Sequence, residues 1–185
     1  MDSLLHINTS SKERVEESFF SVASRLMSDF QLVVNEHRYR LLDIEFYYYA
    51  PGIFEDVYAH RHEAQLQTGK WYFHGSGIDI TFGNGECHGG ILIRAIGKLT
   101  GEGYGDRNGI YKEIHGPLKV KTELFSNMGS AFNKEASYIY LEDVSIDRIG
   151  ANMRVPDYII KTSRINLNPA NDAHRVSGAG AVAFS

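Results

Sequence analysis

The stretch that decides the fold runs from Arg40 to His62 and reads RLLDIEFYYYAPGIFEDVYAHRH. Its first half alternates with a period of two, which is the spacing of a β-strand. Leu42, Ile44, Phe46 and Tyr48 share one face of this strand, and Leu41, Asp43, Glu45, Tyr47 and Tyr49 share the other. We therefore expect the first face to be core and the second face, which carries Glu45, to form the floor of a site.

The flanking sequence indicates an α+β protein. Residues 11–30 place apolar side chains at helical spacing behind a Thr9 or Ser10 cap, and QLVVN (31–35) is expected to pair antiparallel with the strand at Glu45. Further strands are expected at 75–85, 89–99, 136–143, 145–150 and 157–167, and a short helix at 122–133. This order predicts one domain over residues 1–185, with a mixed, mostly antiparallel sheet and flanking helices.

Composition limits the class of protein. The chain has 185 residues, of which 43% are hydrophobic and 12% aromatic, enough to fill the core of one domain. A single cysteine, Cys87, excludes an internal disulfide, and a net charge of −4 gives no overall attraction to a polyanion. Neither a targeting segment nor a membrane-spanning run is visible, so we expect a soluble cytoplasmic protein with no membrane partner.

Two charges stand in strongly apolar strands. Glu45 lies in LLDIEFYYY (41–49), and Arg94 lies in ILIRAI (91–96). Because an unpaired buried charge is costly, we expect the two side chains to pair or to converge on one site. The pattern alone leaves open a structural salt bridge and a functional site.

Other motifs favour ordinary structure. His60 and His62 have the spacing of a metal-binding His-x-His, but no third ligand is suitably spaced, so we predict no metal site. The glycine-rich stretches GNGEC (83–87) and GEGYGDRNG (101–109) fit neither a Walker A loop nor a dinucleotide fingerprint. We predict tight turns there.

Six segments carry a resemblance in their order and spacing. They are LLDIEFYYY (41–49), DVYAH (56–60), GKWYFHGSG (69–77), GGILIRAI (89–96), HGPLKVKTELFSNMG (115–129) and IIKTSRINL (159–167). From about Val22 to Leu167, this set resembles the alkyladenine (3-methyladenine) DNA glycosylase family. The resemblance implies that family's fold, which is also similar to the C-terminal domain of methionyl-tRNA formyltransferase.

The resemblance also implies a function in base-excision repair of duplex DNA. Members flip a damaged purine nucleotide out of the helix, and a glutamate activates the water that displaces the base. Glu45 matches this general base, and Arg94 matches the arginine that keeps it ionised. The remaining matches are Tyr47, His60, Phe82 and Asp79 for substrate binding, and Lys119 and Lys121 for DNA contact. No metal or organic cofactor is implied.

The chain departs from the family at three places. GIDITFG (77–83) has only Phe82 where the family has several tyrosines, and NGECHGG (84–90) is short where the family inserts into DNA. Leu118 stands where the family often has glycine, and the KVK run at 119–121 can also be an ordinary solvated face. A second hypothesis is therefore a divergent, non-catalytic member that binds a small nucleobase-like ligand or another protein through the same pocket.

Overall fold

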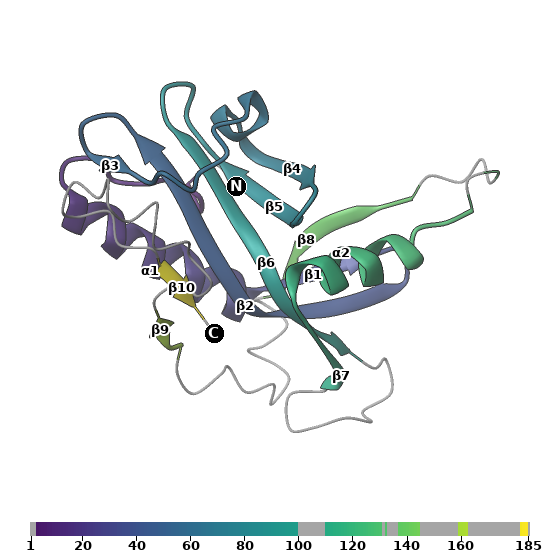
Figure 1. Cartoon of the computed structure of the whole chain (residues 1–185). Helices are drawn as coiled ribbons and strands as arrows, with labels where there is room; N and C mark the ends of the chain where they lie inside the picture. Colours follow the sequence, from purple (N-terminus) through teal and green to yellow (C-terminus); the bar gives the residue numbers. More distant parts are fainter. Residues whose placement is uncertain are drawn as a thin grey trace.

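The computed structural model describes residues 3–99, 110–130, 132, 137–144, 159–162 and 182–184. Within these ranges the chain is an α+β protein with one curled antiparallel sheet and two α-helices (Figure 1). The helices are α1 (Lys12–Asp29), the 3₁₀ turn η1 (Glu63–Leu66) and α2 (Pro117–Ser126). The strands are β1 (Phe30–Val34), β2 (His37–Ala50), β3 (Phe54–Glu55), β4 (Thr68–His74), β5 (Gly77–Phe82), β6 (His88–Leu99), β7 (Ile110–His115), β8 (Ile139–Asp143), β9 (Lys161–Thr162) and β10 (Val182–Phe184).

The long strands β2 and β6 form the centre of the sheet. The main path runs β4-β5-β6-β2-β1-β8, while β3 and β10 pair with β2, β7 with β6, and β9 with β10. Every strand pairing in the described part of the chain is antiparallel. The sheet curls until its two ends meet, because Trp71 Nε1 of β4 donates a hydrogen bond of 3.0 Å to the carbonyl oxygen of Ile139 in β8.

Helix α1 covers one face of β2. Its cap is Ser11, one residue after Ser10 and two after Thr9, and the Ser11 hydroxyl accepts from the Arg14 amide. The ring of Phe19 stacks on Phe46 with 4.5 Å between centroids. The prediction that alternate β2 residues face a core is thus confirmed for Ile44, Phe46 and Tyr48, all of which are buried. It is wrong for Leu42, because the pairing of β2 with β6 is irregular there and Leu41 lies in the core instead.

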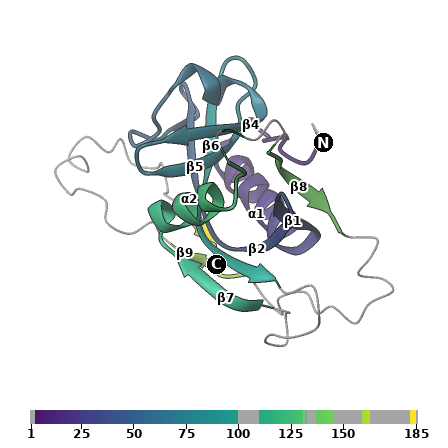
Figure 2. The ribbon, with the colours of Figure 1, turned by 90° about the vertical axis from the view of Figure 1, so that its right-hand side faces the viewer.

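Helix α2 lies on the opposite side of β2 and β6 from α1, as the two views in Figures 1 and 2 show. The sequence predicted this helix at 122–133, but it begins at Pro117 and ends at Ser126. Proline suits the first helical position because its missing N–H would have no helical partner there. The preceding Gly116 has a φ of 102°, and its amide donates to the Arg94 carbonyl oxygen at 2.7 Å.

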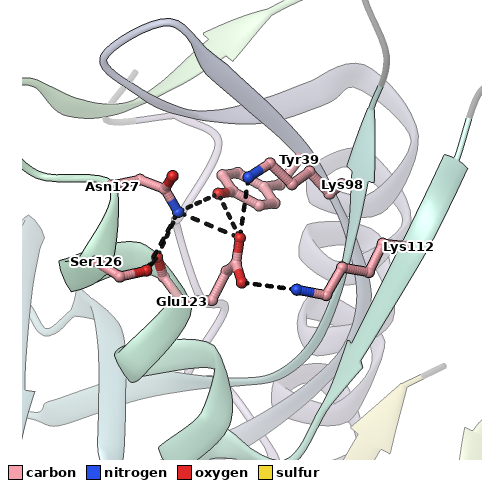
Figure 3. Close-up of polar contacts among 6 residues, drawn as sticks. All are labelled: Tyr39, Lys98, Lys112, Glu123, Ser126 and Asn127. Carbon is pink, nitrogen blue, oxygen red and sulfur yellow. Dashed lines mark hydrogen bonds and ion pairs between the residues drawn. The ribbon is translucent and has the colours of Figure 1, made fainter.

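A polar network anchors α2 to the sheet (Figure 3). Glu123 Oε1 lies 3.2 Å from the Tyr39 hydroxyl and 3.1 Å from Lys98 Nζ, while Oε2 lies 3.2 Å from Lys112 Nζ. Asn127 Nδ2 donates to the Tyr39 hydroxyl and to the Glu123 backbone carbonyl oxygen. The network fixes α2 against β2, β6 and β7, and so fixes the start of α2 near Arg94.

The remaining sequence predictions divide into three groups. Strands β1, β5, β6 and β8 lie where alternation predicts them, whereas β4 and β7 were not predicted. The predicted strand at 145–150 and the turn at 101–109 lie outside the described residues. Of the strand predicted at 157–167, residues 159–162 are described, and they include β9. No helix in the described part of the chain is long and apolar enough to cross a membrane.

Candidate pocket on the face of the central strands

A pocket of about 440 Å³ opens on the face of the sheet opposite α1. It is bounded by β2, β4, β5 and β6, by the β4–β5 turn, by η1 and the segment before it, and by the first residue of α2. Its lining is Glu45, Tyr47, Tyr58, His60, Gln65, His74, Ser76, Asp79, Leu92, Arg94 and Pro117. Five residues predicted from the sequence, Glu45, Tyr47, His60, Asp79 and Arg94, therefore lie in one cavity.

Strand register builds the floor of the pocket. Glu45 of β2 pairs with Leu92 of β6, Leu92 pairs with Asp79 of β5, and Asp79 pairs with Tyr72 of β4. Residues directly opposite one another in adjacent strands project from the same face of a sheet. The floor is thus a cross-strand row with a carboxylate on each side of Leu92.

Glu45 is held as one member of an ion pair at the bottom of the pocket. Only 4% of the residue is exposed. Arg94 Nη1 donates to Glu45 Oε1 at 2.7 Å, and the Tyr47 hydroxyl donates to Glu45 Oε2 at 2.9 Å. The expectation that Glu45 and Arg94 pair is confirmed.

Arg94 also contacts a second carboxyl group, that of Asp43. Its Nε lies 3.7 Å from Asp43 Oδ2, at the point where the pairing of β2 and β6 is locally irregular. Burial raises the pKa of Asp43, and the charges of Arg94 and His115 only partly oppose that rise. One guanidinium therefore lies between two carboxyl groups, of which Glu45 lines the pocket.

Asp79 organises the opposite side of the pocket. The residue is 2% exposed, its Oδ1 lies 3.0 Å from His74 Nε2, and Gln65 Nε2 donates to its Oδ2 at 3.3 Å. His74 Nδ1 accepts from the Ser76 amide at 3.3 Å. Both ring nitrogens of His74 are therefore already used, Nδ1 by the Ser76 amide and Nε2 by Asp79.

Aromatic and imidazole rings form a wall of the pocket beside the Asp79–His74 pair. Tyr72 stacks between His62 and His74, with centroid distances of 4.8 and 5.1 Å. His60 packs perpendicular to His74 at 4.8 Å. Burial and the charge of Asp79 raise the pKa of Tyr72. Within the described residues the His60 ring has ring contacts but no hydrogen-bond partner, so its nitrogens can bond a ligand.

Phe82 does not line the pocket, contrary to the prediction. It lies in the core, where its ring stacks on Tyr48 at 5.3 Å. The cause is strand parity, since Ile78, Ile80 and Phe82 face the core while Asp79 faces the pocket. The pocket therefore lacks the stacking ring that the resemblance implies at Phe82.

The two lysines predicted to contact DNA also lie outside the pocket lining. Lys119 is exposed on the surface of α2. Lys121 Nζ donates to the carbonyl oxygens of His74 and Gly75, at 2.7 and 3.4 Å. Lys121 thus ties α2 to the β4–β5 turn.

Sequence reasoning missed much of the lining. The missed residues are Tyr58, Gln65, His74, Ser76, Leu92 and Pro117. One signal for His74 was present in the sequence. His74 and Asp79 lie on either side of the GSG turn (75–77), at a spacing that a hairpin can bring together. The described residues contain no group of three His, Cys, Asp or Glu side chains placed to hold a metal ion.

Comparisons with known proteins identify no relative. A scan against protein-family models gave no match, and searches of curated proteins and of solved structures gave no significant similarity. The function is therefore argued from the pocket.

Proposed function

We propose that this protein is a DNA N-glycosylase that hydrolyses the bond between a modified purine and its sugar, with Glu45 as general base. The observation that carries the proposal is the Glu45 carboxylate, buried at the floor of a 440 Å³ pocket and bonded to Arg94 and Tyr47. Cavities of roughly 300–1,000 Å³ are typical of small-molecule sites. A single flipped nucleobase is a ligand of suitable class.

The reaction needs few groups. Glu45 accepts a proton from a water molecule, and the water oxygen forms a bond to the sugar carbon C1′. The bond between C1′ and the base nitrogen breaks, and its electron pair goes to the base. A base that is already cationic through alkylation leaves as a neutral molecule. Arg94 favours the charged form of Glu45, and Tyr47 orients it.

The charge and shape of the pocket support a cationic or neutral base rather than an anionic ligand. The carboxyl groups of Glu45, Asp79 and the adjacent Asp43 outnumber the one guanidinium group, that of Arg94. Tyr58 and His60 contribute rings to the lining, and rings bind planar bases through stacking and edge contacts. His60 is the ring whose nitrogens can bond the edge of a base.

One observation favours a second candidate function. The strand that supplies a stacking ring in the resembling family presents Asp79 here, while Phe82 faces the core. A pocket without this ring suits a protein that binds a free nucleobase-like molecule without cleaving DNA. Calorimetric titration with free purines separates the two candidates, because this alternative requires binding without base release.

The test of the first function is base release from duplex oligonucleotides that contain hypoxanthine, ethenoadenine or 3-methyladenine. Release that vanishes in Glu45→Gln supports the glycosylase. Glu36→Gln is the matched control, because Glu36 is exposed in the β1–β2 turn and outside the pocket lining. No release by the folded natural protein, or full release by Glu45→Gln, contradicts the proposal.

A further inference from the structure

We propose that Leu118 is the side chain that enters duplex DNA and fills the space left by the flipped nucleotide. The outward face of α2, made of Leu118, Lys119, Thr122, Phe125 and Ser126, would then be the DNA-contacting surface. This inference rests on the proposed function and names its partner as a duplex. Unstacking a base costs a few kcal/mol, and inserted apolar side chains such as leucine keep the base step open.

The first argument is position. Leu118 is 57% exposed and directly follows Pro117, which lines the pocket. The backbone before it is fixed by the bond from the Gly116 amide to the Arg94 carbonyl oxygen. Gly77 packs closely on the same turn, since a Cβ there would lie 3.1 Å from the Cβ of Pro117. Leu118 is therefore an apolar side chain on a rigid support at the pocket.

The second argument is the apolar strip that continues from Leu118. Leu118 and Phe125 are two helical turns apart, so they lie on the same side of α2. The exposed ring of Phe125 meets the exposed ring of Phe73 of β4 at 5.3 Å. Exposed apolar side chains that cluster, rather than lie scattered, indicate an interaction surface.

The third argument is charge, which favours a nucleic acid as the occupant. The outward face of α2 includes Lys119 and no carboxylate. The one acid of the helix, Glu123, is turned toward Lys98 and Lys112. The start of α2 is also the positive end of the helix dipole, which attracts phosphate. Cationic and apolar groups together match a duplex, with phosphates outside and stacked bases inside.

The fourth argument is that the short β5–β6 hairpin is not available for insertion. Its loop packs on the protein, because the Gly85 amide donates to the Leu66 carbonyl oxygen at 2.8 Å. A Cβ at Gly83 would overlap the backbone of Gln65. Phe82, the last residue of β5, faces the core. Leu118 is thus an exposed apolar side chain beside the pocket lining, on a helix that the hairpin does not cover.

The test compares release of the same modified base from duplex and from single-stranded oligonucleotides by the full chain. We expect Leu118→Ala to lower duplex turnover at least about tenfold and to leave single-strand turnover unchanged, because only a duplex needs its gap filled. Leu118→Met should restore duplex turnover. Phe20→Ala, an exposed apolar change on α1 across the sheet, should affect neither substrate.

The outcomes are distinguishable. If Leu118→Ala leaves duplex turnover unchanged, the role of Leu118 is overturned. The same holds if turnover of the duplex and of the single strand falls by the same factor. Neither outcome contradicts the glycosylase. Absence of Glu45-dependent release from any substrate overturns both proposals. A second readout avoids turnover: binding of Glu45→Gln to a duplex with 2-aminopurine beside the modified base should raise fluorescence. A rise that persists unchanged in Glu45→Gln/Leu118→Ala contradicts insertion.

Discussion

Asp79 of β5 and Glu45 of β2 lie opposite the same residue, Leu92 of β6, so the two buried carboxylates share one row across three strands. Two strand spacings separate their backbones by about 10 Å. Apolar Leu92 lies between the Glu45–Arg94 pair and the Asp79–His74 pair. The pocket therefore has two electrostatic centres that can be perturbed one at a time.

The first prediction concerns Arg94. Replacing it with Gln leaves Glu45 without its cation, and we expect the free energy of unfolding to fall by about 3 kcal/mol. Urea unfolding measures this loss. The double variant Glu45→Gln/Arg94→Gln should lose less stability than the sum of the two single variants. Each single change leaves the other charge buried without its ion-pair partner. Additive losses would show that the pair is not coupled.

The second prediction concerns Gly90, which lies beneath the other centre. A Cβ at this position would lie 2.5 Å from Asp79 Oδ2 and 2.6 Å from Gln65 Nε2. Gly90→Ala should therefore separate Asp79 from Gln65 and cost about 1–3 kcal/mol of stability. Gly75→Ala is the control, because a Cβ there meets nothing within 4 Å. Equal melting temperatures for the two variants would refute the close contact.

The third prediction concerns pH and Glu123. Burial alone would raise its pKa, but hydrogen bonds and charges from Lys98 and Lys112 outweigh burial and lower the pKa below 4.5. A carboxylate with a lower pKa in the folded state stabilises above the pKa of the unfolded chain. That contribution disappears as the pH falls through the folded-state value.

Glu123→Gln tests this sign. At pH 7 the natural protein should be more stable than the variant by about 2 kcal/mol. The difference should shrink as the pH falls from about 5 toward 3, as measured by urea unfolding at each pH. A difference that grows on acidification would mean that the lysines do not stabilise the carboxylate.

The fourth prediction concerns Trp71, the only tryptophan in the sequence. Trp71→Phe removes the bond to Ile139 and should lower stability by about 1 kcal/mol or more. Circular dichroism follows the unfolding, because the variant lacks a tryptophan signal. In the natural protein, the indole fluorescence should change in the same transition. An earlier, separate change would show that β4 detaches from β8 before the sheet unfolds.

Alternation predicted the central strands and the face that carries Glu45, because the two-residue period is a local property of the chain. It placed Ile44 and Phe46 under α1 and put Glu45 and Arg94 on the other face, where they meet. The partner of His74 was not visible in this way, since it depends on how β4 and β5 align across a turn. The start of α2 was missed because a proline inside a helical pattern usually ends the helix, whereas Pro117 begins this one.

Phe82 shows where a resemblance and a local pattern conflict. Matching by motif put this ring in the substrate site, whereas its position one residue from Thr81 and three from Asp79 puts it on the core face of β5. The local pattern prevailed, because turning Phe82 outward would also turn Asp79 into the core. A buried carboxylate without partners costs more than a stacking ring gains.

The bond between Trp71 and Ile139 also joins the two strands that end the main path of the sheet. Strands β4 and β8 end the main path of the sheet, and strands in that position usually offer free amides and carbonyls to other chains. Here a side chain of one terminal strand caps a carbonyl of the other, and Leu4 and Leu5 lie along the same seam. This contact between the two terminal strands therefore shields part of each edge from pairing with another chain.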